Sequence, residues 1–496
     1  MAAMASLMNG ERAVVVFFVA RVVFAVPPSL LFHGLALALL ALAALSLEIR
    51  FEISNSLPLF KTSLGASSGI LLGTVALPTV MMSKLIQISR ALSLNEVSIE
   101  ELEHLTMQYW ATSACCLGVL VYLCIVIWRA PDIVHSLGLR SVWNANFSLS
   151  CIVFYAALCC VSLGTISLTG FNTVLKSFWM LFHGLAAVKL IQHLLSTFPS
   201  CASIGEALLM SSGLVLYFGD MLALTIAKAS RWLITSEVIR YGSKRSEIGI
   251  IIQGLLLGLL LFPAGFKLVL QLWECYLRKV NLESRTYNEI LRSLIFFSSL
   301  GFIMIVIIPS WMQFVQDFHM HPLLWVFSFV FSEPSKRLSL CIYWICIIFI
   351  SILRFYNISK NSKIERILLR KYYHIMAVLM FLPALIYQPK LLDLAFGAAL
   401  GVFLALEIIR ASMVGYKYGV LRWSKSGKKT IEGTAAGITS VLAACSILLP
   451  LLASTGYTEH WFSLIVAVTV SGMLEAYTAQ LDNAFIPLVF YSLLCL

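Results

Sequence analysis

The sequence predicts an all-α, polytopic integral membrane protein. Of its 496 residues, 60% are apolar and only 12% are charged, whereas soluble domains have about 45–50% and about 25% of these classes. No single water-soluble core could bury so much apolar surface. The apolar residues fall in long unbroken runs, while a transmembrane barrel would show alternation along short strands.

Membrane-crossing helices are predicted from runs of about 20 apolar residues, the length that spans a bilayer. Nine runs reach or approach this length, at 29–47, 65–86, 109–128, 147–169, 175–195, 204–227, 248–273, 291–311 and 338–355. Five shorter runs follow, at 374–387, 391–409, 433–453, 461–474 and 484–496. The sequence therefore predicts roughly thirteen transmembrane segments.

The run at 248–273 is expected to form a re-entrant hairpin. It contains Pro263-Ala264-Gly265, and basic stretches flank it on both sides. Because an excess of Lys and Arg marks cytoplasmic loops, the two ends of this run are predicted to lie on the same face. Irregular backbone at membrane depth is tolerated where protein surrounds it, so a hairpin that returns to its starting side fits the pattern.

The charge balance narrows the classes of partner. The formal net charge is +11, from 35 basic and 24 acidic residues, and such an excess in a membrane protein usually marks cytoplasmic loops. Part of it could instead bind an anionic ligand. Nucleic acid is excluded as a partner, because no soluble basic domain is present to hold it. The 12 cysteines form no C-x-x-C pair, which favours a packing role over metal or redox chemistry.

The chain divides into two regions by the residues they carry. Residues 1–330 are predicted to be a multi-span membrane region with few polar side chains at membrane depth, Glu206 and Asp220 being the main exceptions. Residues 338–496 hold nearly all the residue types that perform chemistry. Carboxylates inside a membrane are costly and usually functional, so a transporter with a polar path through the early spans is an alternative.

Two basic stretches of the second region are predicted to share the cytoplasmic face. The paired runs 374–387 and 391–409 enclose Gln388-Pro389 and return the chain to its starting side. The stretches 354–371 and 410–429 therefore lie on the same face, and their charge makes that face cytoplasmic.

A loop rich in glycine and lysine precedes the run at 433–453. Its glycines, lysines and threonines are Gly427, Lys428, Lys429, Thr430, Gly433 and Thr434. The free N–H groups and positive dipole end of the following helix face this loop, which suits a polyphosphate. It is not a Walker A loop, because no glycine stands five residues before Gly427. The alternative is a basic loop that meets anionic lipid headgroups.

Two further groups of polar residues flank the apolar runs of this region. The basic group is Arg366, Arg370, Lys371 and His374. The acidic group is Glu475, Thr478, Gln480, Asp482 and Asn483. Simple membrane anchoring is the alternative for the first, and a plain connecting loop is the alternative for the second. Carboxylates of the second group suit Mg²⁺, which favours one or two carboxylates together with phosphate oxygens.

Two further motifs give only weak evidence of a functional site. Residues 65–69 fit the pattern G-x-S-x-G, but a hydrolase elbow needs a strand before it, and here the motif opens an apolar helix. His319 and His321 stand near Asp317, where an interfacial loop is favoured over a metal site.

Four motifs in the last third resemble the dolichol kinase family, and most closely its plant members. They are RKYYH at 370–374, LEIIR at 406–410, KKTIEGT at 428–434 and EAYTAQLDN at 475–483. The resemblance implies a kinase of the endoplasmic reticulum membrane that transfers the γ-phosphate of CTP to the terminal hydroxyl of dolichol, for protein N-glycosylation. It also implies that CTP binds at 428–434 from the cytosol.

The resemblance and the loop chemistry together assign roles to these residues. Lys428 and Lys429 are expected to bind the β- and γ-phosphates. The residues expected to cradle them are Gly427, Thr430, Gly433 and Thr434. The carboxylates expected to hold Mg²⁺ or orient the acceptor hydroxyl are Glu432, Glu475 and Asp482, with Asp482 and Glu432 as the metal ligands. The residues expected to contact substrate are Arg370, Lys371 and His374.

The sequence departs from the family pattern at one point. The family usually has further spans after the Leu-Glu-x-x-Arg motif, ending in Gly-Asp-x-x-Ala-Ser, whereas here Arg410 runs straight into Ala411 and Ser412. This indicates an internal deletion of several dozen residues, as from alternative splicing. The alternatives to an active kinase are therefore an inactive splice product, a lipid cytidylyltransferase that also uses CTP, or the transporter named above.

Overall fold

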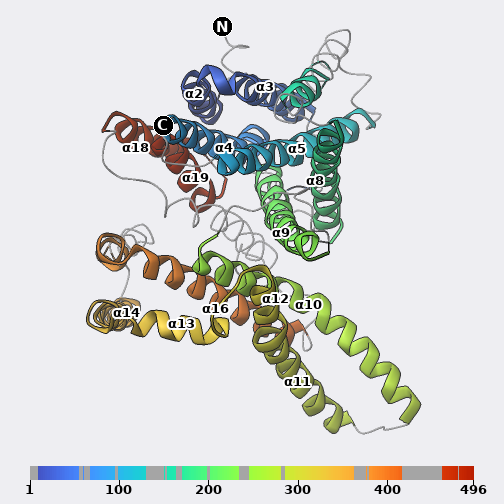
Figure 1. Cartoon of the computed structure of the whole chain (residues 1–496), viewed down its shortest axis with the longest axis vertical. Coiled ribbons are helices and arrows are strands. Elements are labelled where there is room, and N and C mark those ends of the chain that lie inside the picture. Colours follow the sequence, from blue (N-terminus) through green and yellow to red (C-terminus); the bar gives the residue numbers. More distant parts are fainter. Residues whose placement is uncertain are drawn as a thin grey trace. The chain divides into compact units, whose positions relative to one another are not determined.

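The protein is helical throughout the part that the structure describes. The computed structural model describes residues 9–54, 60, 67–94, 99–129, 150, 153–162, 170–197, 202–233, 245–280, 285–361, 376, 379–415, 461–478 and 480–496. Every secondary-structure element among them is a helix (Figure 1). A helix satisfies its backbone hydrogen bonds internally, as the hydrocarbon core of a bilayer demands. The predicted all-α class is confirmed.

The described helices fall into two compact units, one drawn from residues 1–243 and 420–496 and the other from residues 244–419. The first unit contains α2 (Gly10–Phe24), the 3₁₀ turn η1 (Pro28–Leu30), α3 (Leu31–Ser54), α4 (Ile70–Ser93), α5 (Ile99–Arg129), α8 (Gly170–Thr197), α9 (Ile204–Leu233), α18 (Trp461–Tyr477) and α19 (Asp482–Leu494). The second contains α10 (Glu247–Val280), α11 (Arg285–Phe302), the π-helical turn η2 (Ile303–Ile307), α12 (Ile308–Val315), α13 (Pro322–Phe331), α14 (Pro334–Asn361) and α16 (Pro389–Gly415). The predicted functional division near residue 330 stays a prediction.

Nine helices within the described residues are long and apolar enough to cross a membrane. They are Pro28–Glu52, Ile70–Ser93, Glu101–Val126, Lys176–Thr197, Ile204–Ala229, Glu247–Trp273, Ser293–Val315, Pro334–Arg354 and Pro389–Leu406. Each overlaps a predicted run, so these predictions are confirmed. The run at 147–169 contains the shorter helix Val153–Ser162, and the run at 433–453 lies outside the described residues. The total of roughly thirteen spans stays a prediction.

The hairpin predicted at 248–273 is wrong, because α10 continues from Glu247 to Val280 with Pro263 inside it. Proline lacks the N–H that would bond to the carbonyl of Leu259, so the helix loses one hydrogen bond there. Packing against neighbouring helices allows a membrane helix to tolerate that loss. Helix α10 packs against α12 and α16. One missing bond costs less than the several unsatisfied backbone groups of a hairpin turn.

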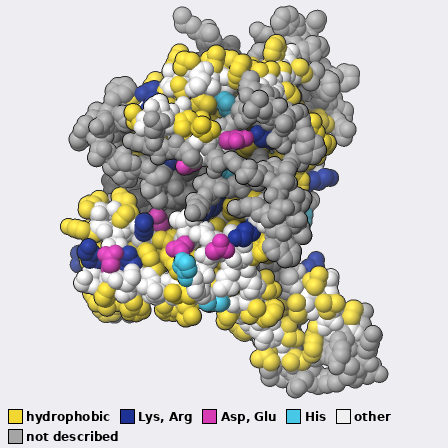
Figure 2. All heavy atoms as spheres, in the orientation of Figure 1, with side chains coloured by type: hydrophobic (Ala, Val, Ile, Leu, Met, Phe, Trp, Pro, Cys, Tyr) yellow, Lys and Arg dark blue, Asp and Glu magenta, His cyan; other side chains and the backbone are white. Residues whose placement is uncertain are grey.

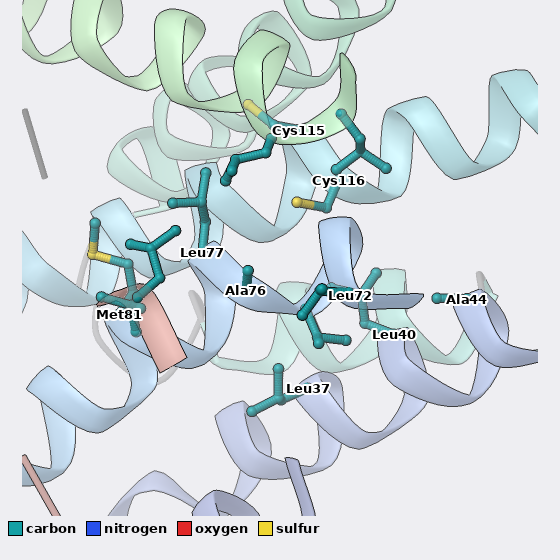
Figure 3. Packing of buried hydrophobic residues seen from close by; sticks show 14 of the residues in the cluster. Leu37, Leu40, Ala44, Leu72, Ala76, Leu77, Met81, Cys115 and Cys116 are labelled. Carbon is teal, nitrogen blue, oxygen red and sulfur yellow. The ribbon is translucent and has the colours of Figure 1, made fainter. Parts of the chain in front are cut away.

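Helix α4 is the centre of the first unit. The structure buries 94% of its most apolar stretch, against 17% for Pro334–Arg354 of α14. Helices α2, α3, α5, α9 and α19 all pack against it. Figure 3 shows the interlocking side chains of α3, α4 and α5, among them Leu37, Leu40, Ala44, Leu72, Ala76, Leu77, Met81, Cys115 and Cys116.

Helices α11 to α14 of the second unit leave much of their apolar surface uncovered. Only 17% of the most apolar stretch of Ser293–Val315 is buried, and Phe327 and Phe349 are 64% and 62% exposed. Figure 2 shows hydrophobic side chains over much of the described surface on this face. An apolar surface of this extent is rare on soluble monomers, and it suits helices that contact lipid.

Two glycines allow α4 and α9 to approach closely. A Cβ at Gly73 would lie 2.6 Å from the Cα of Gly205, and a Cβ at Gly205 would overlap the carbonyl oxygen of Gly69. The N–H of Gly205 donates to the carbonyl of Ser68 at 3.3 Å across the crossing. Small residues permit such crossings between membrane helices. The crossing brings the N-terminal ends of α4 and α9 together.

A Gly205→Ala variant tests this crossing. The added methyl group meets backbone atoms that cannot rotate away, so we expect the free energy of unfolding in detergent to fall by about 1–3 kcal/mol. Gly472→Ala in α18 is the matched control, because a Cβ there meets nothing within 4 Å. A Gly205→Ala variant as stable as that control would contradict the close approach.

Candidate functional site

The predicted site residues are described to very different extents. The nucleotide-binding candidates lie outside the described residues: Gly427, Lys428, Lys429, Thr430, Glu432, Gly433 and Thr434. The basic substrate candidates also lie outside them: Arg370, Lys371 and His374. Glu475 and Asp482 are described as helical backbone, without their side chains. The connection between α18 and α19 is therefore the part of the predicted site whose geometry is known.

The connection between α18 and α19 is short and places two carboxylate residues at its ends. Glu475 is in the last turn of α18, and Asp482 is the first residue of α19. The N–H of Thr478 donates to the carbonyl of Leu474 at 2.8 Å. The Thr478 hydroxyl accepts from the N–H of Gln480 at 3.1 Å. These bonds hold the backbone at Thr478 and Gln480, between the two carboxylate residues.

Gln480 anchors this connection to the first unit's core. Its side chain is only 7% exposed. The Nε2 atom donates to the carbonyl of Ser67 at 3.0 Å, and Oε1 accepts from the hydroxyl of Ser203. Ser67 precedes α4 and Ser203 precedes α9. One buried amide thus joins the connection to the N-terminal ends of two other helices.

Ser203 and Glu206 form a capping box at the start of α9. The N–H of Ser203 donates to Glu206 Oε2 at 3.0 Å, and the N–H of Glu206 donates to the Ser203 hydroxyl at 3.2 Å. This reciprocal pair satisfies two N–H groups at the helix end. The Ser203 hydroxyl, having accepted from Glu206, donates its own proton to Gln480. The carboxylate of Glu206 therefore has a capping role in this structure.

The turn before α4 needs glycine at position 69. Gly69 has φ +72°, in the left-handed region that glycine adopts without strain, and a Cβ there would lie 2.5 Å from Gln480 Cδ. The N–H of Gly69 donates to the Ser67 hydroxyl at 3.1 Å. That hydroxyl donates to Glu48 Oε1 at 3.0 Å. Ser67 is buried against a carboxylate directly before α4, so its hydroxyl has a structural role in the described part of the G-x-S-x-G pattern.

Glu48 is the centre of the polar contacts in the first unit. Its side chain is 1% exposed. Oε1 accepts from Arg12 Nε at 2.7 Å, and Oε2 accepts from the N–H of Leu71 at 2.6 Å. Together with the Ser67 hydroxyl, these donors come from α2, α4 and the turn before α4. A buried carboxylate is stable only when paired and hydrogen-bonded in this way.

Arg12 completes the pairing from the start of α2. Its Nη2 atom lies 2.7 Å from Glu52 Oε1, and its N–H donates to the side chain of Asn9 at 2.9 Å. Burial disfavours the charged guanidinium, but the bonds and charges of Glu48 and Glu52 outweigh this and raise the pKa of Arg12. We call the connected residues the Arg12–Gln480 network: Arg12, Glu48, Glu52, Ser67, Ser203 and Gln480.

Sequence reasoning did not find this network, although some of its members had a visible signal. Glu48 follows directly on an apolar run, and Arg12 directly precedes another. An ionisable residue beside a membrane segment needs a partner. The sequence does not say which residue is that partner, because Arg12 and Glu48 are far apart along the chain.

The network positions the predicted carboxylates and has no metal site of its own. Among the described residues, no three His, Cys, Asp or Glu side chains are grouped so as to hold a metal ion. His321 accepts from the N–H of Leu323 at 3.3 Å through Nδ1 and so caps α13. The Arg12–Gln480 network therefore contributes to the predicted site by holding the backbone that carries Glu475 and Asp482.

Comparison with known proteins gives a consistent set of relatives. The chain is 56% identical to the dolichol kinase EVAN of Arabidopsis thaliana, over 99% of both proteins. It is 23% identical to the dolichol kinase of Bos taurus over 35% of this chain and 47% of that protein. It is 21% identical to the dolichol kinase of Mus musculus over 61% of this chain and 66% of that protein. No family model matches the chain, and no solved structure matches it significantly.

The alignment with the Arabidopsis protein requires gaps in this chain. It extends over 564 positions, 68 more than the 496 residues present here. At least 68 positions of that protein therefore have no counterpart. A deletion of several dozen residues before Ala411 would account for such gaps, and its location stays a prediction.

An Arg12→Met variant tests the network. Removal of the guanidinium leaves Glu48 buried without its charged partner, so we expect a loss of about 3–5 kcal/mol in the free energy of unfolding. The double variant with Glu48→Leu should recover most of that loss, since both charges are then absent. Lys176→Met is the control, because its partner Glu103 is 47% exposed and such pairs contribute at most about 1 kcal/mol. Equal stability of Arg12→Met and wild type would refute the role of the pair.

Proposed function

The chain belongs to the dolichol kinase family, and we propose that it transfers the γ-phosphate of CTP to the terminal hydroxyl of dolichol. The observation that carries this proposal is the identity with a plant dolichol kinase along nearly the whole chain. The membrane-length helices suit a substrate that is itself a membrane lipid. The product, dolichyl phosphate, would then serve protein N-glycosylation.

The loop from Gly427 to Thr434 is proposed to bind the triphosphate. Phosphoryl transfer depends mostly on positioning and on stabilisation of charge. Lys428 and Lys429 would contact the β- and γ-phosphates, and the backbone at Gly427 and Gly433 would approach them closely. The hydroxyls of Thr430 and Thr434 would complete the cradle. The support is the residue chemistry of the loop and its place before an apolar run, where helix N–H groups favour anions.

The carboxylates at the α18–α19 connection are proposed to act on the acceptor side. Glu475 or Asp482 would orient the acceptor hydroxyl, and the anchoring of Gln480 would keep these two positions constant. Carboxylates are ligands that Mg²⁺ accepts, so Asp482 and Glu432 are the proposed metal ligands. The ion would neutralise charge on the phosphate oxygens. Arg370, Lys371 and His374 are proposed to contact the substrate.

We place the site on the cytosolic side of the endoplasmic reticulum membrane. The support is the pair of basic stretches at 354–371 and 410–429, since such stretches favour the cytosolic face. The nucleotide loop follows the second of them directly.

One observation favours a second candidate, an inactive product of the same gene family. At least 68 positions of the Arabidopsis protein have no counterpart here, and a deletion before Ala411 would place the family's Gly-Asp segment among them. The aspartate of that segment is a candidate for binding Mg²⁺ or for proton transfer. A chain without this aspartate would keep the fold and lose most of its phosphoryl-transfer activity.

The decisive measurement is transfer from γ-labelled CTP to dolichol by membranes that contain this chain. We expect labelled dolichyl phosphate, at a rate that rises when the missing segment is restored from the Arabidopsis sequence. If only the restored chain forms labelled dolichyl phosphate, the chain as it stands is the inactive product. A product of cytidylyl mass without the label would show a cytidylyltransferase, which releases the γ-phosphate with pyrophosphate.

A Lys428→Ala variant in the restored chain tests the nucleotide loop. Loss of one group that stabilises transferring charge lowers turnover by about 10²–10³-fold, and we expect a loss of that size. Lys417→Ala is the matched control, because it removes the same charge from the same basic stretch. Equal losses of turnover at both positions would mean that the loop attracts anionic lipid headgroups and does not bind the triphosphate. Unchanged transfer in Lys428→Ala would contradict the assignment of Lys428 to the phosphates.

A further inference from the structure

The second unit contains an apolar pocket lined by residues of α10, η2, α12, α13, α14 and α16. Its volume is about 370 Å³, within the range of roughly 300–1,000 Å³ that ligand pockets occupy. The lining includes Ile252, Met304, Ile308, Val326, Trp344 and Leu391. Among the described lining residues, Trp344 is the one with a side-chain nitrogen or oxygen, and its N–H is bonded to the carbonyl of Met380 at 2.9 Å.

This lining restricts the chemistry of the occupant. No side chain of the described lining offers a charge or an unused N–H or O–H donor. A nucleotide, a metal ion or a sugar would lose its hydration there without compensation. The chemistry that fits the pocket is therefore a hydrocarbon chain.

The wall formed by η2 and α12 combines tight contacts with adaptable side chains. A Cβ at Gly258 of α10 would lie 2.7 Å from Ile308 Cγ1 and 2.8 Å from Met304 Sδ, so α10 presses directly on this wall. Met304 belongs to the π-helical turn η2, a feature frequent at functional sites. Methionine side chains adapt to irregular shapes, which suits a branched chain.

A polar cluster lies next to one part of the pocket. Arg337 is 7% exposed and donates to Gln388 Oε1 at 3.2 Å and to Glu333 Oε1 at 3.0 Å. Val330 and Leu391, which line the pocket, each lie three residues from a member of this cluster. Arg337, Glu333 and Gln388 bond to one another and are not among the residues that line the pocket.

Helix α16 connects the pocket to a family motif. Its residues Leu391 to Ala398 line the pocket, and the helix continues to Gly415. Glu407, the acidic residue of the motif at 406–410, is nine residues beyond Ala398. At 1.5 Å per residue this is about 14 Å along the helix axis. A chain seated in the pocket and lying along α16 would reach the motif with its end.

We propose that this pocket binds isoprene units of the polyprenyl alcohol, a few units away from the hydroxyl that receives the phosphate. The proposal rests on the proposed function, because that function supplies the prenyl chain. A prenyl chain carries a methyl branch in every unit and a double bond in most of them, so it is wider and stiffer than an acyl chain and needs a pocket of some width. Binding here gives the enzyme a preference for chains long enough to fill it.

The test is photolabelling with a long-chain prenol that carries a diazirine on an isoprene unit near the hydroxyl end. In the full chain in vesicles, we expect label on peptides that line the pocket. Ala395→Phe fills the pocket, and overpacking of this kind costs about tenfold or more in binding, so its label should fall by that factor. Ala264→Phe is the matched control, because Ala264 is exposed on α10 and does not line the pocket.

A second variant and a competitor complete the test. Ala398→Phe lies at an exposed position of the lining, so it blocks the pocket without disturbing buried packing and should also lose the label. Unlabelled long-chain prenol should compete, and phosphatidylcholine at equal concentration should not. Label that persists in both variants would show that the prenol does not bind in this pocket. Equal competition by phosphatidylcholine would show general lipid binding. Either result overturns the proposal.

The kinetic arm separates this inference from the proposed function. In the restored chain we expect Ala395→Phe to raise the KM for long-chain prenol about tenfold, with the KM for CTP and for a three-unit prenol unchanged. Absence of transfer in every form, with pocket labelling intact, would refute the kinase function alone. Normal transfer with an unchanged KM for the long chain would refute the pocket alone.

Discussion

The buried carboxylate of Glu48 is the constraint on which the first unit depends. A charge inside an apolar helical core is stable only when its bonds are satisfied, and Glu48 receives donors from Arg12, Ser67 and Leu71. These donors belong to separate segments, so α2, α3 and the start of α4 must take one relative arrangement. Apolar packing between helices in lipid lacks such direction, since lipid tails are as apolar as the helices.

Gln480 extends the same arrangement to the C-terminal helices. It bonds to Ser67 and Ser203, more than two hundred residues away in sequence, and it lies between the backbone positions of Glu475 and Asp482. The N-terminal region thus has a role beyond supplying membrane spans. It holds in place the connection that carries two predicted catalytic carboxylates.

The two units offer complementary chemistry for a reaction on a lipid. The first unit contains a buried polar network that fixes backbone positions, and the second contains a pocket whose described lining has no free polar group. A prenyl alcohol has the same division, with a single reactive hydroxyl on a long hydrocarbon chain.

The sequence alone determined the all-α class and nine membrane-length helices. The reason is that the length of an apolar run is a local property, and the thickness of the bilayer sets the length that a spanning helix needs. The motifs at 370–374, 406–410, 428–434 and 475–483 likewise indicated the family. Only the tertiary structure decided that α10 passes through Pro263, that Glu206 caps α9, and that Ser67, Glu48 and Gln480 meet. These outcomes depend on which residues, distant in sequence, become neighbours in the fold. Packing supplies the partners that allow a proline inside a helix or a charge in the core.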